Sequence, residues 1–259
     1  SRHPNVQQVP KGATKLTSNA HDGGGGDASD GASICVREAF RAPTGFVLLS
    51  ADYSQLELRL LAVMSNDPKL ISFLVEGGDL FKRLTATWHN KPLDAVTPTE
   101  RQHTKGITYG LMYGLGVEKL ADNLNLPTAN AKTLKTQFLN SFKTLGNFLE
   151  HLKNHAKKQG SVTTMGGRSR PLPSIRSSNA TERNRAERQA VNSVIQGSAA
   201  DLMKEAMLQC VAELARHRLR ARLIAQLHDE VLFEVHEDDA DRCAEVVREC
   251  METIGSFFE

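Results

Sequence analysis

Two apolar stretches that carry aspartates constrain the fold of this chain more than any other feature of its sequence. The first covers residues 46–52 and ends in Asp52, and the second covers residues 223–233 and is interrupted by a polar turn that contains Asp229. They predict one strand and one hairpin of two strands. A single aspartate at a strand end is more often a cap or turn residue. Two such carboxylates brought together would bind hard divalent cations, and paired cations of that kind activate phosphoryl transfer.

The composition is that of a globular protein with an uneven distribution of charge. Of the 259 residues, 40% are hydrophobic and 24% are charged, and no apolar run is long enough to predict a membrane span or a membrane partner. The net charge is +2, but residues 151–189 hold nine Lys or Arg against two acids, whereas residues 228–259 hold eleven acids against two Arg. This asymmetry suits a protein that holds a polyanion in one region and metal ions in another, although solvated helical faces would give the same pattern. The four cysteines lack the spacing of a zinc site and fit a reducing compartment.

A well-formed helix start lies at residues 97–100. Thr97 can cap the helix, Pro98 suits its first position, and Glu100 completes a capping box. The helix is expected to run to about residue 113. Gly106 and Gly110 lie inside it, where they cost stability but let another group approach the backbone closely.

Four side chains recur at intervals of four along this helix and therefore form one stripe on its surface. They are Arg101, Lys105, Tyr109 and Tyr113. Two cations followed by two aromatic rings suit a ligand with phosphates at one end and a sugar or base at the other.

The remaining segments predict further helices and one loop. A glycine-rich loop is expected at 21–33. A helix is expected over about 128–158, interrupted near Gly146 and ended by Gly160. Two separate helices are expected near 180–193 and 197–217, and a last one over about 238–254.

Five motifs resemble those of the family A DNA polymerases, the group of bacterial polymerase I, and they occur in the same order. Residues 52–59 resemble motif A, residues 101–114 resemble motif B, and residues 228–230 resemble motif C. Residues 1–10 are similar to the start of the palm, and residues 188–201 to the helix that contacts primer-template DNA.

The residues of these motifs are most similar to those of the polymerase theta branch of the family. The similarity is clearest at 51–59, 196–201 and 226–230. The segment 207–226 is shorter than in theta proteins of animals, so a mitochondrial or polymerase I-like relative stays open.

The resemblance implies an α+β fold in which a palm, built on an antiparallel sheet with helices, carries an inserted all-helical fingers subdomain. The palm would comprise residues 1–65 and 190–259, and the fingers residues 66–189. The thumb would lie outside this sequence, so we expect the segment alone to bind primer-template DNA weakly and to polymerise poorly.

The resemblance also assigns roles to individual residues. Catalytic roles fall to Asp52, Asp229, Lys105 and Glu230, and metal binding to Asp52, Tyr53 and Asp229. The residues implied to bind the incoming dNTP are Arg101, Lys105, Tyr109, Glu57, Gln55 and Tyr53. Those implied to bind DNA are Tyr113, Arg168, Arg188, Asn192, Gln196 and His228. Glu57 would exclude the 2′-hydroxyl of a ribonucleotide.

These roles imply a template-directed DNA polymerase that transfers nucleotides from dNTPs to a primer 3′-hydroxyl. The implied cofactor is a pair of Mg²⁺ ions, for which Mn²⁺ can substitute, and the partners are primer-template DNA and dNTPs. The resemblance further implies a monomer that acts in DNA repair in the nucleus, with a mitochondrial or bacterial cytoplasmic location as alternatives. Two other functions stay open: a DNA-binding module without catalysis, and a metal-dependent nuclease that uses the same carboxylates.

Overall fold

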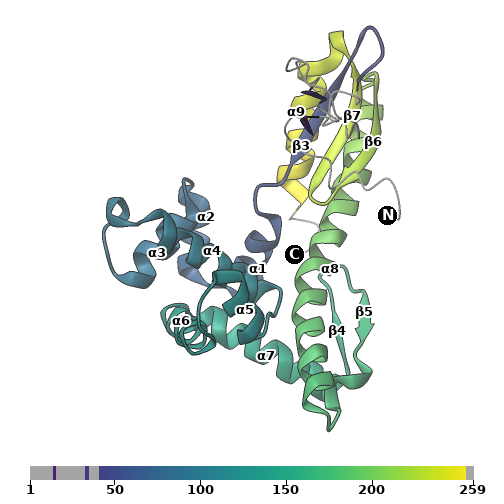
Figure 1. Ribbon diagram of the computed structural model, residues 1–259. Coiled ribbons are helices and arrows are strands. Elements are labelled where there is room, and N and C mark those ends of the chain that lie inside the picture. Colours follow the sequence, from purple (N-terminus) through teal and green to yellow (C-terminus); the bar gives the residue numbers. More distant parts are fainter. Residues whose placement is uncertain (1–13, 16–32, 35–40, 255–259) are drawn as a thin grey trace, which may run out of the picture. The chain divides into compact units, whose positions relative to one another are not determined.

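The computed structural model describes residues 14–15, 33–34 and 41–254 (Figure 1). The motif at 1–10 and the glycine-rich loop expected at 21–33 lie outside these ranges, apart from Ser33. The chain divides into two units: Ser1–Tyr53 with Ala206–Ile254, and Ser54–Glu205 with Gly255–Glu259. Helices and small antiparallel sheets make up the described residues, which confirms the expected α+β class. The palm and fingers boundaries stay a prediction.

The first unit is built on a three-stranded antiparallel sheet. The strands are β3 (Phe46–Asp52), β6 (Ala221–Leu227) and β7 (Glu230–His236), in the order β3-β7-β6. Every second residue of β7 is buried, since side chains alternate across a strand. The helix α9 (Ala240–Thr253) follows the 3₁₀ turn η5 (Glu237–Asp239) and contacts β3 and β7. The short strands β1 (Thr14–Lys15) and β2 (Ser33–Ile34) form a separate antiparallel pair. The strand, hairpin and final helix predicted from the sequence are thus confirmed.

The second unit is mainly helical. Its elements are α1 (Leu56–Ser65), α2 (Pro68–Glu76), α3 (Leu80–His89), η3 (Leu93–Ala95), α4 (Pro98–Met112), α5 (Val117–Leu124), α6 (Thr128–Ser141), α7 (Lys143–Gln159), β4 (Ser161–Thr163), β5 (Ser169–Pro171), η4 (Pro173–Arg176) and the first part of α8 (Ala180–Arg216). The core includes Phe138, Phe142, Leu84 and Ile107, all with an exposed fraction of 1% or less. Within residues 41–254, no helix combines the length and the apolarity that a bilayer span requires.

The helix α4 begins as the sequence predicts. The Thr97 hydroxyl accepts a hydrogen bond from the Glu100 N–H, and the Glu100 carboxylate accepts one from the Thr97 N–H. The two glycines inside α4 make room for α5. A Cβ on Gly106 would lie 2.5 Å from a methyl carbon of Leu124, and a Cβ on Gly110 would lie 2.9 Å from one of Leu120. The close approach that these glycines permit is therefore helix packing.

Two helix boundaries differ from the predicted ones. The break expected near Gly146 occurs at Phe142, whose side chain is buried in the core and whose backbone leaves the helical region with φ −120° and ψ 63°. Gly146 lies within α7, which ends at Gly160 as predicted.

The two helices expected at 180–193 and 197–217 are one continuous helix, α8. Gly197 lies inside this helix, and its missing side chain makes room for the β4–β5 hairpin. A Cβ there would lie 2.5 Å from the methyl carbon of Thr164.

Candidate active site

The sheet of the first unit gathers carboxylates at one end. In the ladder between β3 and β7, Asp52 lies opposite Glu230. The N–H of Tyr53 donates to the carbonyl of Asp229 at 3.1 Å, which closes the ladder beyond the last paired residues. The structure therefore brings together Asp52, Tyr53, Asp229 and Glu230. The Ser50 hydroxyl donates to the Glu230 carboxylate across the same pair of strands.

The backbone is left-handed beside Asp229 and three residues after Asp52. His228, the first residue of the β6–β7 turn, has φ 59°, and Gln55, at the N-cap of α1, has φ 57°. Non-glycine residues adopt this conformation at a cost of roughly 1 kcal/mol or more, and such positions cluster at functional sites. At His228 the conformation follows from the two-residue turn between the paired residues Leu227 and Glu230, which requires a positive φ at its first position.

The phenol of Tyr53 is held away from any ligand by the first unit's own packing. Its hydroxyl donates to the carbonyl of Met251 in α9 at 2.6 Å. Burial, together with the nearby thiols of Cys210 and Cys250, raises the pKa of Tyr53 well above its usual value. The group of Tyr53 that is left to bind a metal is therefore its main-chain carbonyl, as the sequence resemblance implies.

The donors at this end fit Mg²⁺. Carboxylate and carbonyl oxygens are the hard ligands that Mg²⁺ prefers, and it binds through one or two carboxylates while substrate phosphates and water supply the rest. In the described part of the chain, no group of three or more His, Cys, Asp or Glu could hold a metal unaided. Two carboxylates suit a Mg²⁺ site whose other ligands come from substrate phosphates and water.

In the second unit, α4 presents the predicted stripe. The rings of Tyr109 and Tyr113 stack at a centroid distance of 6.1 Å with an interplanar angle of 14°. The Lys105 Nζ lies 6.0 Å from the Tyr109 ring centroid, and for this lysine the described residues supply no carboxylate partner. All four stripe residues are half-buried, so each keeps a surface that a ligand can contact.

Two residues support this stripe: Phe81 of α3 and Asp79 at the N-cap of that helix. The sequence did not indicate either role. Phe81, with an exposed fraction of 4%, lies beneath the cations: its ring centroid is 5.9 Å from the guanidinium carbon of Arg101 and 5.9 Å from Lys105 Nζ. The Arg101 Nε donates to Asp79 Oδ2 at 2.6 Å. Burial opposes ionisation of Asp79, but hydrogen bonds from Arg101 and from the Lys82 N–H lower its pKa below the ordinary value. The sequence did carry a signal for Asp79, because an aspartate just before the apolar start of a helix predicts a helix N-cap.

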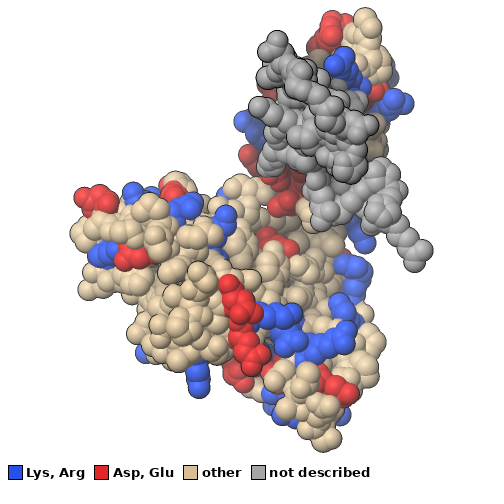
Figure 2. Space-filling view, viewed as in Figure 1, with Lys and Arg blue, Asp and Glu red and all other residues tan. Residues whose placement is uncertain are grey.

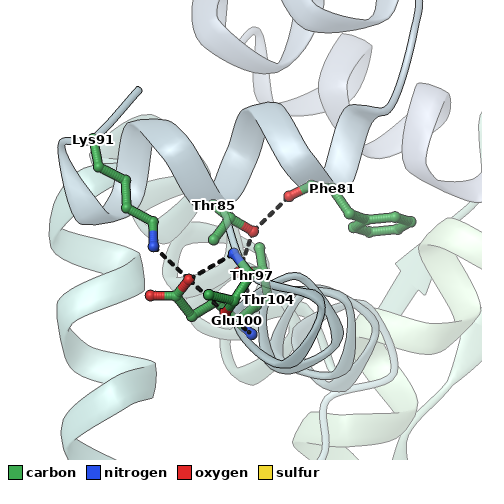
Figure 3. Close-up of polar contacts among 6 residues, drawn as sticks. All are labelled: Phe81, Thr85, Lys91, Thr97, Glu100 and Thr104. Atoms are coloured by element: carbon green, nitrogen blue, oxygen red, sulfur yellow. Dashed lines mark hydrogen bonds and ion pairs between the residues drawn. The ribbon is translucent and has the colours of Figure 1, made fainter. Parts of the chain in front are cut away.

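Figure 3 shows polar contacts that connect α3 and the residues after it to α4 and its N-cap. The buried Thr85 hydroxyl lies 2.7 Å from that of Thr104, and Lys91 forms an ion pair with Glu100. That lysine, with the hydrogen bonds from Thr97, lowers the pKa of Glu100 to about 2. The residues that support the stripe therefore belong to a helix that is tied to α4 by polar contacts as well as by packing.

The face of α8 that was expected to contact DNA is partly occupied by the end of α4. A Cβ on Gly114, which has φ 60°, would lie 3.0 Å from the Arg188 Cα. With its amide nitrogen turned toward α4, Asn192 donates to the Tyr113 carbonyl at 2.9 Å and to the Met112 carbonyl at 3.2 Å. Asn192 thus caps the last turn of α4, a role that the sequence did not indicate.

Two further expected DNA contacts, Arg168 and Gln196, line a pocket of about 280 Å³ between α8 and the β4–β5 hairpin, whereas His228 lies in the β6–β7 turn of the first unit. The lining of the pocket includes Arg168, Arg170, Asn192 and Gln196. Arg168 forms an ion pair with Asp201 and donates to the Gly197 carbonyl at 2.9 Å, so it also fastens the hairpin to α8. Figure 2 shows Lys and Arg side chains gathered beside acidic ones over the part of the second unit where α5 and α8 lie.

Glu57 lies in the first turn of α1, two residues after Gln55, and is half-buried. The backbone of this turn is fixed, because the Gln55 carbonyl accepts hydrogen bonds at 3.0 Å from the N–H groups of Leu58 and Arg59. The carboxylate of Glu57 is thus attached to a rigid turn immediately after the strand that ends in Asp52.

Residues 1–257 match the model of DNA polymerase family A. The chain is 36% identical to DNA polymerase theta of Mus musculus, over 85% of this chain and 10% of that protein, and 37% identical to DNA polymerase I of Bacillus caldotenax, over 84% of this chain and 25% of that protein. Among solved structures it is similar to the POL domain of Pol1 from M. smegmatis, in complex with DNA primer-template and dNTP. That match has a TM-score of 0.83 and 36% identity, and it covers 97% of this chain and 41% of the other. The chain thus spans a quarter or less of the length of the mouse and Bacillus caldotenax polymerases.

Proposed function

Because the chain belongs to DNA polymerase family A, we propose that it carries the nucleotidyl-transfer site of a template-directed DNA polymerase. The observation that carries the proposal is the meeting of Asp52 and Asp229 at one end of the β3-β7-β6 sheet. The M. smegmatis structure, which holds primer-template DNA and dNTP, supports the same partners for this chain.

In the proposed reaction, the primer 3′-hydroxyl gives up its proton to water, its oxygen forms a bond to the α-phosphorus of the dNTP, and the bond from that phosphorus to the pyrophosphate oxygen breaks. Asp52 and Asp229, with the Tyr53 carbonyl, would hold two Mg²⁺ ions. When bound, such ions lower the pKa of the attacking hydroxyl and stabilise the leaving pyrophosphate. Lys105 and Arg101 bind the triphosphate, and Lys105 gives a proton to the leaving pyrophosphate.

Tyr109 and Glu57 would act on the sugar of the incoming nucleotide. The Tyr109 ring packs against the deoxyribose, and the Glu57 carboxylate occupies the space that a 2′-hydroxyl needs. The Glu57→Ala variant should therefore incorporate ribonucleotides more readily than the wild type. Unchanged discrimination between dNTPs and rNTPs in single-nucleotide insertion would place the sugar filter elsewhere.

The proposal is tested by primer extension with the longest natural polypeptide that carries this sequence. Asp229→Asn should abolish Mg²⁺-dependent extension while leaving the melting temperature near that of the wild type. The control is Asp238→Asn, which removes an exposed carboxylate of the same unit that pairs with Arg220 away from the site. Extension that survives Asp229→Asn would refute the two-metal assignment. Degradation of the labelled primer without extension would favour a nuclease.

We also propose that the protein acts as a monomer in DNA repair in the nucleus. The support is the similarity of its motifs to the polymerase theta branch and its 36% identity to the mouse protein. Its 37% identity to a bacterial polymerase I makes a bacterial cytoplasmic protein the competing proposal. Imaging of the tagged protein in its own cells decides between these locations, and sedimentation measures the oligomeric state.

A further inference from the structure

The carboxylate of Asp79 is shared between two neighbouring elements, and each of its oxygens has a different task. Oδ1 accepts the N–H of Lys82 at 3.1 Å and so caps the first turn of α3. Oδ2 accepts Nε–H of Arg101 at 2.6 Å and so reaches α4. Because Oδ1 is fixed by the helix cap, the position of Oδ2 is fixed as well. Arg101 is therefore bonded to a carboxylate whose position is set by the helix cap and not by the arginine side chain.

The contact with Asp79 determines which part of Arg101 is left for a ligand. The carboxylate takes Nε, so the terminal nitrogens Nη1 and Nη2 keep their donors. That end of the guanidinium is the part that forms paired hydrogen bonds with phosphate oxygens. Phe81 limits the guanidinium from a second side, with its ring centroid 5.9 Å from the guanidinium carbon.

Arg101 would otherwise be a mobile side chain. It is partly exposed, with 38% of its side-chain surface accessible, and a free arginine has a large rotamer entropy that binding must overcome. An arginine already oriented toward the phosphates loses less entropy when the triphosphate arrives. The Asp79 carboxylate also reduces the repulsion between Arg101 and Lys105, which lie one turn apart on the same stripe.

We propose that Asp79 is a positioning residue for nucleotide binding, which holds Arg101 so that Nη1 and Nη2 face the triphosphate of the incoming dNTP. The inference rests on the proposed function, in which Arg101 and Lys105 bind that triphosphate. A carboxylate beside a phosphate-binding arginine could instead act as a competitor that the nucleotide must displace, and the two roles predict opposite effects on dNTP affinity.

The test compares variants of the longest natural polypeptide that carries this sequence, with dATP opposite a template thymine. Asp79→Asn keeps a good helix cap but removes the charge that holds Arg101. It should raise the KM for dATP about 10-fold, which corresponds to about 1.4 kcal/mol, with a much smaller change in kcat. The matched control is Glu76→Gln, which removes a carboxylate from the nearby ion pair with Arg83 and should leave the KM unchanged.

A double-variant cycle separates positioning from a purely structural role. Adding Asp79→Asn to Arg101→Ala should change the KM for dATP by less than about 2-fold, since the positioned group is already gone. An undiminished effect in the Arg101→Ala background would show that Asp79 acts through the fold alone. A lower KM in the single variant Asp79→Asn would show that the carboxylate competes with the triphosphate. Either result overturns the inference.

The proposed function fails in a different way. If Arg101→Ala itself leaves the KM for dATP unchanged, the triphosphate is not bound by this stripe, whatever Asp79 does. Equilibrium titration with a non-hydrolysable dATP analogue measures the same differences without turnover. The loss of affinity for the analogue in Asp79→Asn should match the rise in KM, and equal affinity in wild type and variant would contradict positioning.

Discussion

The two buried threonines between α3 and α4 make a quantitative prediction about how these helices are joined (Figure 3). Thr85 and Thr104 are both fully buried. Their hydroxyl oxygens lie 2.7 Å apart, and each also lies within hydrogen-bonding distance of a carbonyl of its own helix: Phe81 at 2.6 Å for Thr85, and Glu100 at 2.9 Å for Thr104. The two hydroxyls have one proton each for three contacts, so only two of the three hydrogen bonds form at once.

The magnitude follows from this proton count. Replacing Thr104 by Val leaves the Thr85 hydroxyl able to donate to Phe81, and replacing Thr85 leaves Thr104 able to donate to Glu100. Neither variant leaves a buried donor unpaired, so each should lose only the net value of one hydrogen bond, about 1 kcal/mol. The second substitution then removes the hydroxyl that still donates to a carbonyl of its own helix. The double variant loses both hydrogen bonds and should therefore cost about 2 kcal/mol, the sum of the two single losses.

The assay is equilibrium unfolding of the four proteins in urea, with thermal melting as a second measurement. A loss of about 1 kcal/mol corresponds to a shift of roughly 2–4 °C in a domain of this size. Thr108→Val is the matched control, because the Thr108 hydroxyl is equally buried on α4 but bonds only to the Thr104 carbonyl of its own helix. A single variant that loses as much stability as the double variant would refute the reasoning, since it would mean that the remaining hydroxyl does not pair with the carbonyl of its own helix.

Two further outcomes are expected. Gly197→Ala should lower stability by about 1 kcal/mol despite the better helix propensity of Ala, because the new Cβ would lie 2.5 Å from the Thr164 methyl carbon, and a hydrogen bond to the Thr164 hydroxyl fixes the rotamer of that side chain. Gly146→Ala is the control: its Cβ would have no neighbour closer than 3.7 Å, so this variant should be neutral or stabilising. Equal melting temperatures for the two variants would contradict this reasoning. The Glu100 carboxylate, whose pKa the Lys91 ammonium holds at about 2, stabilises the fold above its unfolded pKa of about 4.5 and loses this effect as the pH falls toward 2. The stability difference between wild type and Glu100→Gln should therefore be present at pH 6 and vanish at pH 2, and a difference independent of pH would exclude the ionised carboxylate as its cause.

Features that depend on neighbours within a few residues could be predicted from the sequence. The capping box at Thr97 and Glu100 is one, because both partners lie within a single turn of chain. The strand that ends at Asp52 and the hairpin turn at Asp229 are others, since an apolar run followed by a polar turn is a local pattern. The four-residue recurrence that places Arg101 through Tyr113 on one stripe follows from helix geometry alone.

Features that depend on what packs against a residue could not be predicted in this way. Gly146 was interpreted as a helix break, but it lies inside α7, and the break falls at Phe142, whose ring the core buries. The interruption expected between 193 and 197 does not occur, since α8 continues through it. Asn192 has a polar stripe position that fits a DNA contact, yet it caps the end of α4 because the two helices meet there.

The sequence by itself thus determined the chemistry of this protein, that is, which carboxylates, cations and aromatic rings it carries and at what spacing along each element. Only the tertiary structure decided how they are supported: Asp52 beside Glu230 on neighbouring strands, and Asp79 and Phe81 against Arg101 on neighbouring helices. The physical reason is range. Spacing within one helix or strand is fixed by backbone geometry, whereas a contact between elements depends on how their side chains fit together in the core.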